Sequence, residues 1–151
     1  MRTIGGKKVL LTGAASGIGR ALALRFAAEG AIQLLIDIDE VGLAETVAEC
    51  KAVGAEVEGR FADVSQQQQV TDLVQHILAT WGGVDILVNN AGITYYGRLH
   101  EMSQEHWDRL LQINLHAPIQ FTRELLPSLL ARREAHVVNM CSIFGLVGMP
   151  K

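Results

Sequence analysis

Short apolar runs alternate with longer amphipathic stretches along the whole chain. The apolar runs predict strands at Val9–Leu11, Ile32–Ile36, Glu56–Phe61, Val84–Val88 and Ala135–Met140. The stretches between them predict helices at Ile18–Ala28, at Val41–Val53, from just after Ser65 to about Trp81, and from Ser103 to about Leu130. Strands that alternate with helices predict an α/β fold, a parallel sheet with helices on both faces. Most of these strands are continuous apolar runs, which is typical of strands that are covered on both sides.

Composition narrows the class of protein. The chain has 151 residues, of which 49% are hydrophobic, and this predicts one domain with a buried core. The same content excludes disorder, the two cysteines exclude a disulfide scaffold, and a net charge of −3 argues against a nucleic-acid binder. No apolar run is long enough to span a membrane and no secretory signal is visible, so we expect a cytoplasmic protein. The five histidines share no metal-type spacing, so we predict no metal site.

Two serines mark expected helix starts. Ser65 and Gln68 form a capping-box pattern, in which Ser65 caps the helix and Gln68 reaches back. Ser103 is the expected cap of the long helix that follows it. The glutamine tract 66–69 is interpreted as a solvated helix face.

Polar residues follow each predicted strand. They are Thr12-Gly13, Asp37, Asp63, Asn89-Asn90 and Ser142. Because the carboxyl ends of parallel strands share one edge of the sheet, these residues are expected to lie near one another. Open parallel sheets bind their ligands in the crevice beyond that edge. The sequence therefore predicts a binding site there.

A glycine-rich turn joins the first strand to the first helix. Gly13 permits a tight turn, Gly17 lets the backbone approach a pyrophosphate, and Gly19 lets the helix pack closely on the sheet. The helix N-terminus offers free N–H groups and a partial positive charge to that pyrophosphate. A turn of this kind between a strand and a helix, with an acidic residue at the end of the next strand, predicts dinucleotide binding.

Asp37 is that acidic residue. Its carboxylate can accept hydrogen bonds from the ribose diol of adenosine, and it repels a 2′-phosphate. Neither Ala15 nor Ile38 supplies a compensating positive charge, so NAD is expected in preference to NADP. The alternative is that Asp37 caps the second helix, although Asp39 is the closer candidate for that role.

Three motifs together resemble the classical short-chain dehydrogenase/reductase family. They are Thr12-Gly13-x-x-x-Gly17-Ile18-Gly19, Asn89-Asn90-Ala91-Gly92 and Ser142-x-x-Gly145, and the likeness extends from Lys7 to Gly148. The resemblance implies a doubly wound Rossmann-type sheet with strand order 3-2-1-4-5. It also implies an oxidoreductase that transfers a hydride between a nicotinamide cofactor and an alcohol or ketone.

The resemblance assigns roles to individual residues. The implied cofactor-binding residues are Gly13, Ser16, Gly17, Ile18, Gly19, Asp37, Asp63, Val64, Asn90, Ala91 and Gly92. Among them, Asp63 and Val64 are expected beside the adenine. For Asn89, direct contact with the cofactor and a structural role in a turn stay equally open.

Asn114 and Ser142 are the implied catalytic residues. The family uses the serine to hydrogen-bond the substrate oxygen, and its asparagine holds a water in a proton relay. Asn114 also falls on a predicted apolar stripe formed by Trp107, Leu111, Asn114, Pro118, Phe121 and Leu125. An unpaired amide there is costly, so Asn114 is expected to have a partner, either that water or the backbone. Tyr95, Tyr96 and Arg98 either rim a substrate cleft or form an ordinary exposed loop.

One part of the family pattern is missing from this sequence. The family's chemistry needs a Tyr-x-x-x-Lys pair after the serine, and the 151 residues contain none. We therefore expect the chain to be the first part of a longer enzyme, inactive alone and a homodimer or homotetramer when complete. Its fifth strand is then expected to be a bare sheet edge. The alternative is a non-catalytic nucleotide-binding fragment or pseudoenzyme.

Overall fold

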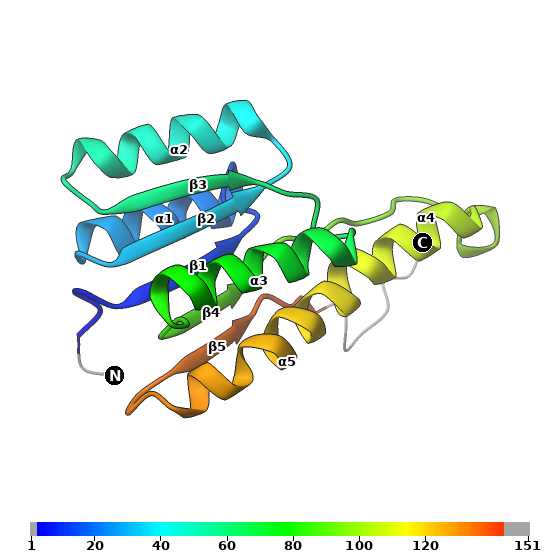
Figure 1. Cartoon of the computed structure of the whole chain (residues 1–151). Helices are drawn as coiled ribbons and strands as arrows, with labels where there is room; N and C mark the ends of the chain where they lie inside the picture. Colours follow the sequence, from blue (N-terminus) through cyan, green and yellow to red (C-terminus); the bar gives the residue numbers. More distant parts are fainter. Residues whose placement is uncertain (1–2, 144–151) are drawn as a thin grey trace.

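Five strands form one parallel sheet with helices on both faces (Figure 1). This computed structural model describes residues 3–143. The strands are β1 (Lys8–Thr12), β2 (Ile32–Asp37), β3 (Val57–Phe61), β4 (Ile86–Asn89) and β5 (His136–Asn139). The helical segments are α1 (Gly17–Ala28), α2 (Glu40–Ala52), α3 (Gln67–Trp81), η1 (Leu99–Glu101), α4 (Gln104–Leu111), η2 (Gln112–His116) and α5 (Ala117–Leu130). The strand order β3-β2-β1-β4-β5 confirms the predicted Rossmann-type sheet.

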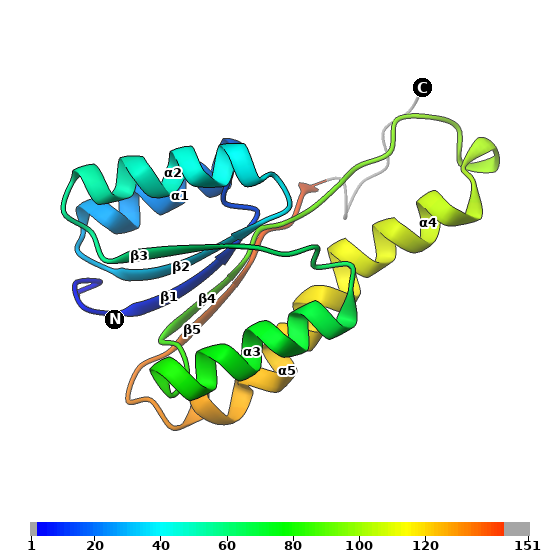
Figure 2. The same cartoon turned by 45° about the horizontal axis from the view of Figure 1, so that its top comes forward.

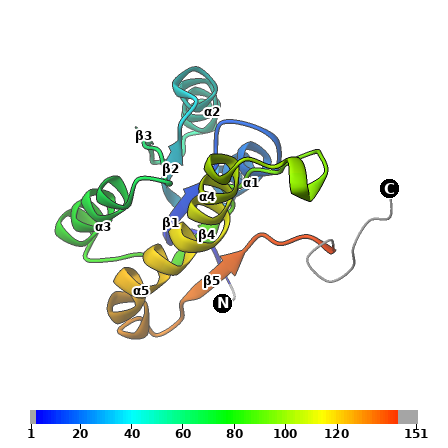
Figure 3. The same ribbon diagram turned by 90° about the vertical axis from the view of Figure 1, so that its right-hand side faces the viewer.

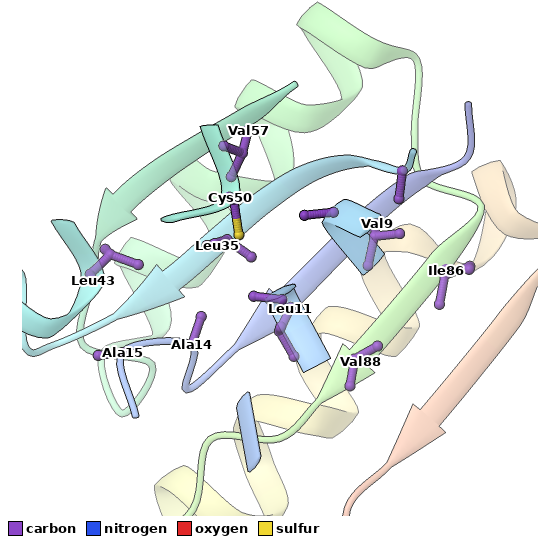
Figure 4. Packing of buried hydrophobic residues seen from close by; sticks show 13 residues of the cluster. Val9, Leu11, Ala14, Ala15, Leu35, Leu43, Cys50, Val57, Ile86 and Val88 are labelled. Carbon is purple, nitrogen blue, oxygen red and sulfur yellow. The ribbon is translucent and has the colours of Figure 1, made fainter. Parts of the chain in front are cut away.

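Two apolar clusters hold the layers together. Helices α1 and α2 cover one face of the sheet, and α3 and α5 cover the other (Figure 2). Strand β1 contributes to both clusters, because successive side chains of a strand point to opposite faces. Val9 and Leu11 pack toward α1 and α2 (Figure 4), whereas Leu10 packs toward α3 and α5. The central strand is therefore buried on both sides, as its continuous apolar run predicts.

Two of the predicted helix caps are present. One carboxylate oxygen of Asp39 accepts hydrogen bonds from the backbone N–H groups of Val41 and Gly42, both at 3.1 Å, at the start of α2. The Ser103 hydroxyl accepts one from the N–H of His106 at 3.2 Å, at the start of α4. Asp39, and not Asp37, is thus the cap of α2.

The predicted capping box at Ser65 is wrong. Helix α3 begins later, and its N-cap is Gln66, whose side chain makes no capping hydrogen bond. The reason is that the Ser65 N–H donates to the Asp63 carboxylate at 2.9 Å, which places Ser65 in a turn before the helix. Gln68 does not reach back but donates forward to Asp72 at 2.8 Å.

The long helix predicted after Ser103 contains a π-helical turn, η2, between α4 and α5. An i→i+5 turn inserts one extra residue and rotates the following helix relative to the preceding one. The predicted apolar stripe is therefore broken: Phe121 and Leu125 are buried, but Trp107 is 41% exposed and Asn114 is exposed. The buried side instead consists of Ile113, Ala117, Gln120, Phe121, Leu125 and Leu129.

Strand β5 lies at one edge of the sheet. Val137 and Val138 are 39% and 40% exposed, so within the described residues β5 is the bare edge that the sequence predicts. Helix α4 continues the line of α5 beyond the carboxyl ends of the strands (Figure 2). Figure 3, which looks toward those ends, shows α4 in front of the sheet with the segment that precedes it at its side. Among residues 3–143, no helix combines the length and apolar character needed to cross a membrane.

Candidate cofactor cleft

An open cleft of about 380 Å³ lies at the carboxyl ends of β1, β2 and β4 and after β3. Its volume is within the range of small-molecule sites. All of the predicted cofactor-binding residues line it: Gly13, Ser16, Gly17, Ile18, Gly19, Asp37, Asp63, Val64, Asn90, Ala91 and Gly92. The residues that sequence reasoning missed are Ile36, Ile38, Ala62, Ile93, Arg109 and Ile113. The fold thus gathers segments that are far apart in sequence into one site.

The glycine turn has little room for side chains. A Cβ at Gly19 would lie 1.8 Å from the Gly13 carbonyl oxygen, and one at Gly13 would lie 2.8 Å from the Ala91 Cα. Gly17 differs, because the space in front of it is open and its φ of +52° disfavours a side chain. The turn is therefore closed toward the sheet and open toward the cleft at Gly17, where a pyrophosphate would need to approach.

The N-terminus of α1 also suits an anion. Ser16 is the N-cap residue, yet its side chain makes no capping hydrogen bond, and the first turn carries no acidic residue. The first N–H groups of the helix and its partial positive charge are thus left for an outside partner. The residues present fit a dinucleotide pyrophosphate.

Asp37 is fixed by the backbone around it. One carboxylate oxygen accepts the N–H groups of Ile38 at 2.7 Å and Asp39 at 3.0 Å. The other accepts the N–H of Ala15, in the glycine turn, at 2.8 Å. Asp37 therefore ties the end of β2 to the glycine turn and presents its carboxylate in the cleft, where a ribose diol can also bond to it.

Hydrogen bonds join the carboxyl end of β1 to the segment that follows β4. The Thr12 hydroxyl accepts the N–H groups of Asn90 and Ala91, both at 3.1 Å. In return, the Asn90 side-chain amide donates to the carbonyl oxygens of Thr12 and Gly13, both at 3.0 Å. Because its NH2 group is bonded to the turn, Asn90 shapes the cleft wall. The sequence marks Thr12 as a polar residue at the end of a strand, but it did not indicate that its hydroxyl holds the segment after β4.

Asn89 lies within the sheet, and it is not in the lining of the cleft. It is the last residue of β4, it is 4% exposed, and its amide donates to the Asn139 side chain on β5 at 2.8 Å. The predicted turn role is wrong, because Asn89 belongs to strand β4 and pairs in register with Asn139 of β5. The hydrogen bond from the buried Asn89 side chain to the exposed Asn139 side chain instead joins the ends of β4 and β5.

Asp63 and Arg109 form an ion pair in the lining of the cleft. One Asp63 oxygen accepts the Ser65 N–H at 2.9 Å, and the other lies 3.7 Å from the Arg109 guanidinium. The Gln69 side chain accepts the Asp63 N–H at 2.9 Å. The glutamine tract is therefore not only a solvated helix face. No signal in the sequence indicated Arg109, because its partner Asp63 belongs to a distant segment of the chain.

Neither of the two predicted catalytic residues is in the lining of the cleft, but Asn114 bonds to Ile93, which lines it. Asn114, in η2, accepts the Ile93 N–H at 2.9 Å and donates to the Ile93 carbonyl at 2.8 Å, so the backbone is its partner. Ser142 is exposed and follows the end of β5. Gly145, the last residue of that motif, lies outside the described residues.

The loop after β4 carries the residues of uncertain role. The Tyr95 ring packs at a tilt on the His106 ring of α4, with 5.7 Å between centroids. Tyr96 is 88% exposed and Arg98 pairs with Glu101 in η1. The Tyr95–His106 contact holds the loop against α4, whereas the Arg98–Glu101 pair lies within the loop itself.

The fold and cleft define a Rossmann-type protein, and comparisons with known proteins identify the family. A model of the short chain dehydrogenase family matches residues 7–151. The 3-oxoacyl-(acyl-carrier-protein) reductase FabG of Thermotoga maritima is 37% identical over 145 residues, which cover 96% of this chain and 59% of the relative.

Two solved structures are similar as well. A short chain dehydrogenase/reductase from Burkholderia phymatum in complex with NAD is 40% identical, with a TM-score of 0.92 over 99% of this chain and 54% of that one. A metagenomic short-chain oxidoreductase in complex with NADP is 34% identical, with a TM-score of 0.85 over 89% of this chain and 61% of that one.

The chain belongs to the short-chain dehydrogenase family, whose members compared here include oxidoreductases that bind NAD or NADP. It spans 54–61% of the length of these relatives.

Proposed function

We propose that the whole protein is an oxidoreductase that transfers a hydride between NAD and an alcohol or ketone. The observation that carries this proposal is the cleft, in which the open turn at Gly17, the uncapped N-terminus of α1 and the Asp37 carboxylate converge. A nicotinamide cofactor would supply the hydride chemistry there. The chain's own residues bind the pyrophosphate, orient the ribose and exclude other conformations of the turn.

The preference for NAD rests on charge. Asp37 lies in the cleft wall at the expected ribose position, and the adjacent Ile38 offers no cation to a 2′-phosphate. The cleft's one cation among the described residues, Arg109, is paired with Asp63. A carboxylate at this position repels a 2′-phosphate and accepts a ribose hydroxyl. Of the two similar solved structures, one is a complex with NAD and the other a complex with NADP, so titration of this protein with both cofactors tests the preference.

The catalytic roles rest on the resemblance. Ser142 would hydrogen-bond the substrate oxygen, and Asn114 would hold the water of a proton relay. The Asn114 side chain is already bonded to Ile93 on both of its polar atoms, so a water there would share an oxygen with that bond or use the backbone. Asn114 thereby also fixes the backbone that follows Gly92.

A homodimer or homotetramer in the cytoplasm, acting on a small molecule and not on nucleic acid, suits a chain with a net charge of −3. The long helix supports self-association, since its outward side exposes Leu115, Ile119, Leu126 and Leu130.

Calorimetric titration of the whole protein with NAD and with NADP tests the cofactor proposal. We expect NAD to bind more tightly, and equal affinities would contradict the role of Asp37. Failure of both to bind would contradict the proposed function.

Steady-state kinetics of Ser142→Ala then test catalysis: turnover should fall far more than NAD affinity. An unchanged rate would remove Ser142 from the active site.

A further inference from the structure

Helix α2 contains a glycine where a better helix former would be expected. Gly42 is the third residue of α2, behind the Asp39 cap, and its φ is not in the left-handed region. Neither turn geometry nor capping therefore requires glycine here. Alanine has the higher helix propensity, so the choice of glycine needs another reason.

That reason is the closeness of α2 to the glycine turn. A Cβ at Gly42 would lie 3.0 Å from the Ala15 carbonyl oxygen and 3.1 Å from the Ala15 Cβ. It would also lie 2.7 Å from an Asp39 carboxylate oxygen, but the end of that side chain can move. The Ala15 contact is with backbone, so a side chain at Gly42 displaces the turn.

Ala15 is held from its other side as well. Its N–H donates to Asp37 at 2.8 Å, and the preceding Ala14 N–H donates to the Ile36 carbonyl at 3.1 Å. Ala14 and Ala15 are 0% and 3% exposed, and both belong to the apolar cluster that includes Leu43, the neighbour of Gly42 (Figure 4). The glycine turn is thus held between the end of β2 and the N-terminal residues of α2.

We propose that Gly42 is a positioning residue for the phosphate-binding turn, because its missing side chain lets α2 close on Ala15 while Asp37 holds the Ala15 N–H. This inference rests on the proposed function for the identity of the ligand. The next residues after Ala15 are Ser16 and Gly17, which face the cleft. A displacement at Ala15 therefore passes directly to the N–H groups that would meet a pyrophosphate.

The test compares Gly42→Ala with Ala48→Gly in the whole protein. Ala48 is exposed on the same helix, so its exchange changes helix propensity without touching the turn. For Gly42→Ala we expect the Kd of NAD to rise about fivefold, since small misplacements of binding groups are costly. The Kd of adenosine, which lacks the pyrophosphate, should change less, and Ala48→Gly should change neither. Gly42→Ala with unchanged NAD affinity, or an equal loss for adenosine, would overturn the proposal.

Hydrogen exchange without ligand provides a second measurement. The Ala15 amide should exchange faster in Gly42→Ala and in Asp37→Ala than in the unmodified protein, and at the same rate in Ala48→Gly. If the Ala15 amide of Asp37→Ala exchanged at the same rate as in the unmodified protein, Asp37 would not hold the turn. That result would overturn the proposal even if Gly42→Ala did not fold. If the unmodified protein does not bind NAD while these exchange rates change as expected, the proposed function fails and the positioning role stands.

Discussion

Thr12 and Asn90 exchange two hydrogen bonds, one through each side chain, across the exits of β1 and β4. Each side chain bonds to the other residue's backbone, so the pair fixes two loops relative to each other. The Thr12 hydroxyl additionally accepts the Ala91 N–H. Thr12 is only 3% exposed. Its one hydroxyl therefore shapes the wall of the cleft between the adjacent strands β1 and β4.

Thr12→Val should destabilise the protein by about 2 kcal/mol, because it leaves the backbone N–H groups of Asn90 and Ala91 without their acceptor. Urea unfolding measures the change. Thr12→Ser, which keeps the hydroxyl, is the matched control and should lose much less. Equal losses in the two variants would assign the effect to packing and not to the hydrogen bonds.

Asp37→Ala should reduce the difference between the affinities for NAD and NADP. The variant removes both the acceptor for the ribose and the charge that repels a 2′-phosphate. Because the Ala15 N–H also loses its acceptor, NAD affinity itself should fall. Calorimetric titration with both cofactors measures this, and an undiminished preference for NAD would show that another residue selects the cofactor.

Gln33→Met should leave the protein as stable or make it more stable. Gln33 is fully buried in β2; its amide donates to the Ala23 carbonyl at 3.0 Å, but its Oε1 has no hydrogen-bond partner. A buried polar atom without a partner costs about 1–3 kcal/mol, and Met has a similar shape without that atom. Thermal unfolding checks the result, with Gln33→Ala as a control that should lose stability by leaving a cavity. A large loss in Gln33→Met would show that the hydrogen bond outweighs the unpaired oxygen.

Cys50 should make the stability depend on alkaline pH. Burial raises the pKa of its thiol above the ordinary value of 9.0, and the charge of Glu49 adds to the shift. The unfolded chain then loses this proton at a lower pH than the folded one. The contribution is fully present below about pH 9 and is lost as the pH rises through the folded pKa. Urea unfolding of the protein and of Cys50→Ala between pH 8 and 10.5 should show the steeper decline in the former, and parallel declines would contradict the assignment.

The sequence predicted the sheet because its signal is local. Each apolar run and each capping residue, such as Asp39 and Ser103, acts within one element, and alternating elements leave few arrangements. Prediction was weaker where one extra residue in a helix changes the direction in which the side chains point. The extra residue in η2 turned Asn114 out of the expected stripe, and no periodicity in the sequence indicated it.

Contacts across the site were likewise hidden. The sequence marked Asp37 and the glycines by their spacing, but the bond from Ala15 to Asp37 joins residues 22 positions apart. Arg109 reaches Asp63 from a helix on another part of the chain, and Asn89 pairs with Asn139 across the sheet. Such pairs depend on how the elements are placed, which hydrophobic patterning does not specify at the level of single atoms.

The hydrogen bonds that Asn90 makes with Thr12 and Gly13 also set the order in which parts of the cleft form during synthesis. Thr12 and Gly13 leave the ribosome early, but their partner Asn90 follows them by 78 and 77 residues. Local helices such as α1 can form before that segment appears, whereas closing so long a loop carries an entropy cost that only the packed sheet offsets. The glycine turn therefore reaches its final shape only after β4 has joined β1, and a chain interrupted before Asn90 would contain the whole glycine motif without a finished cofactor cleft.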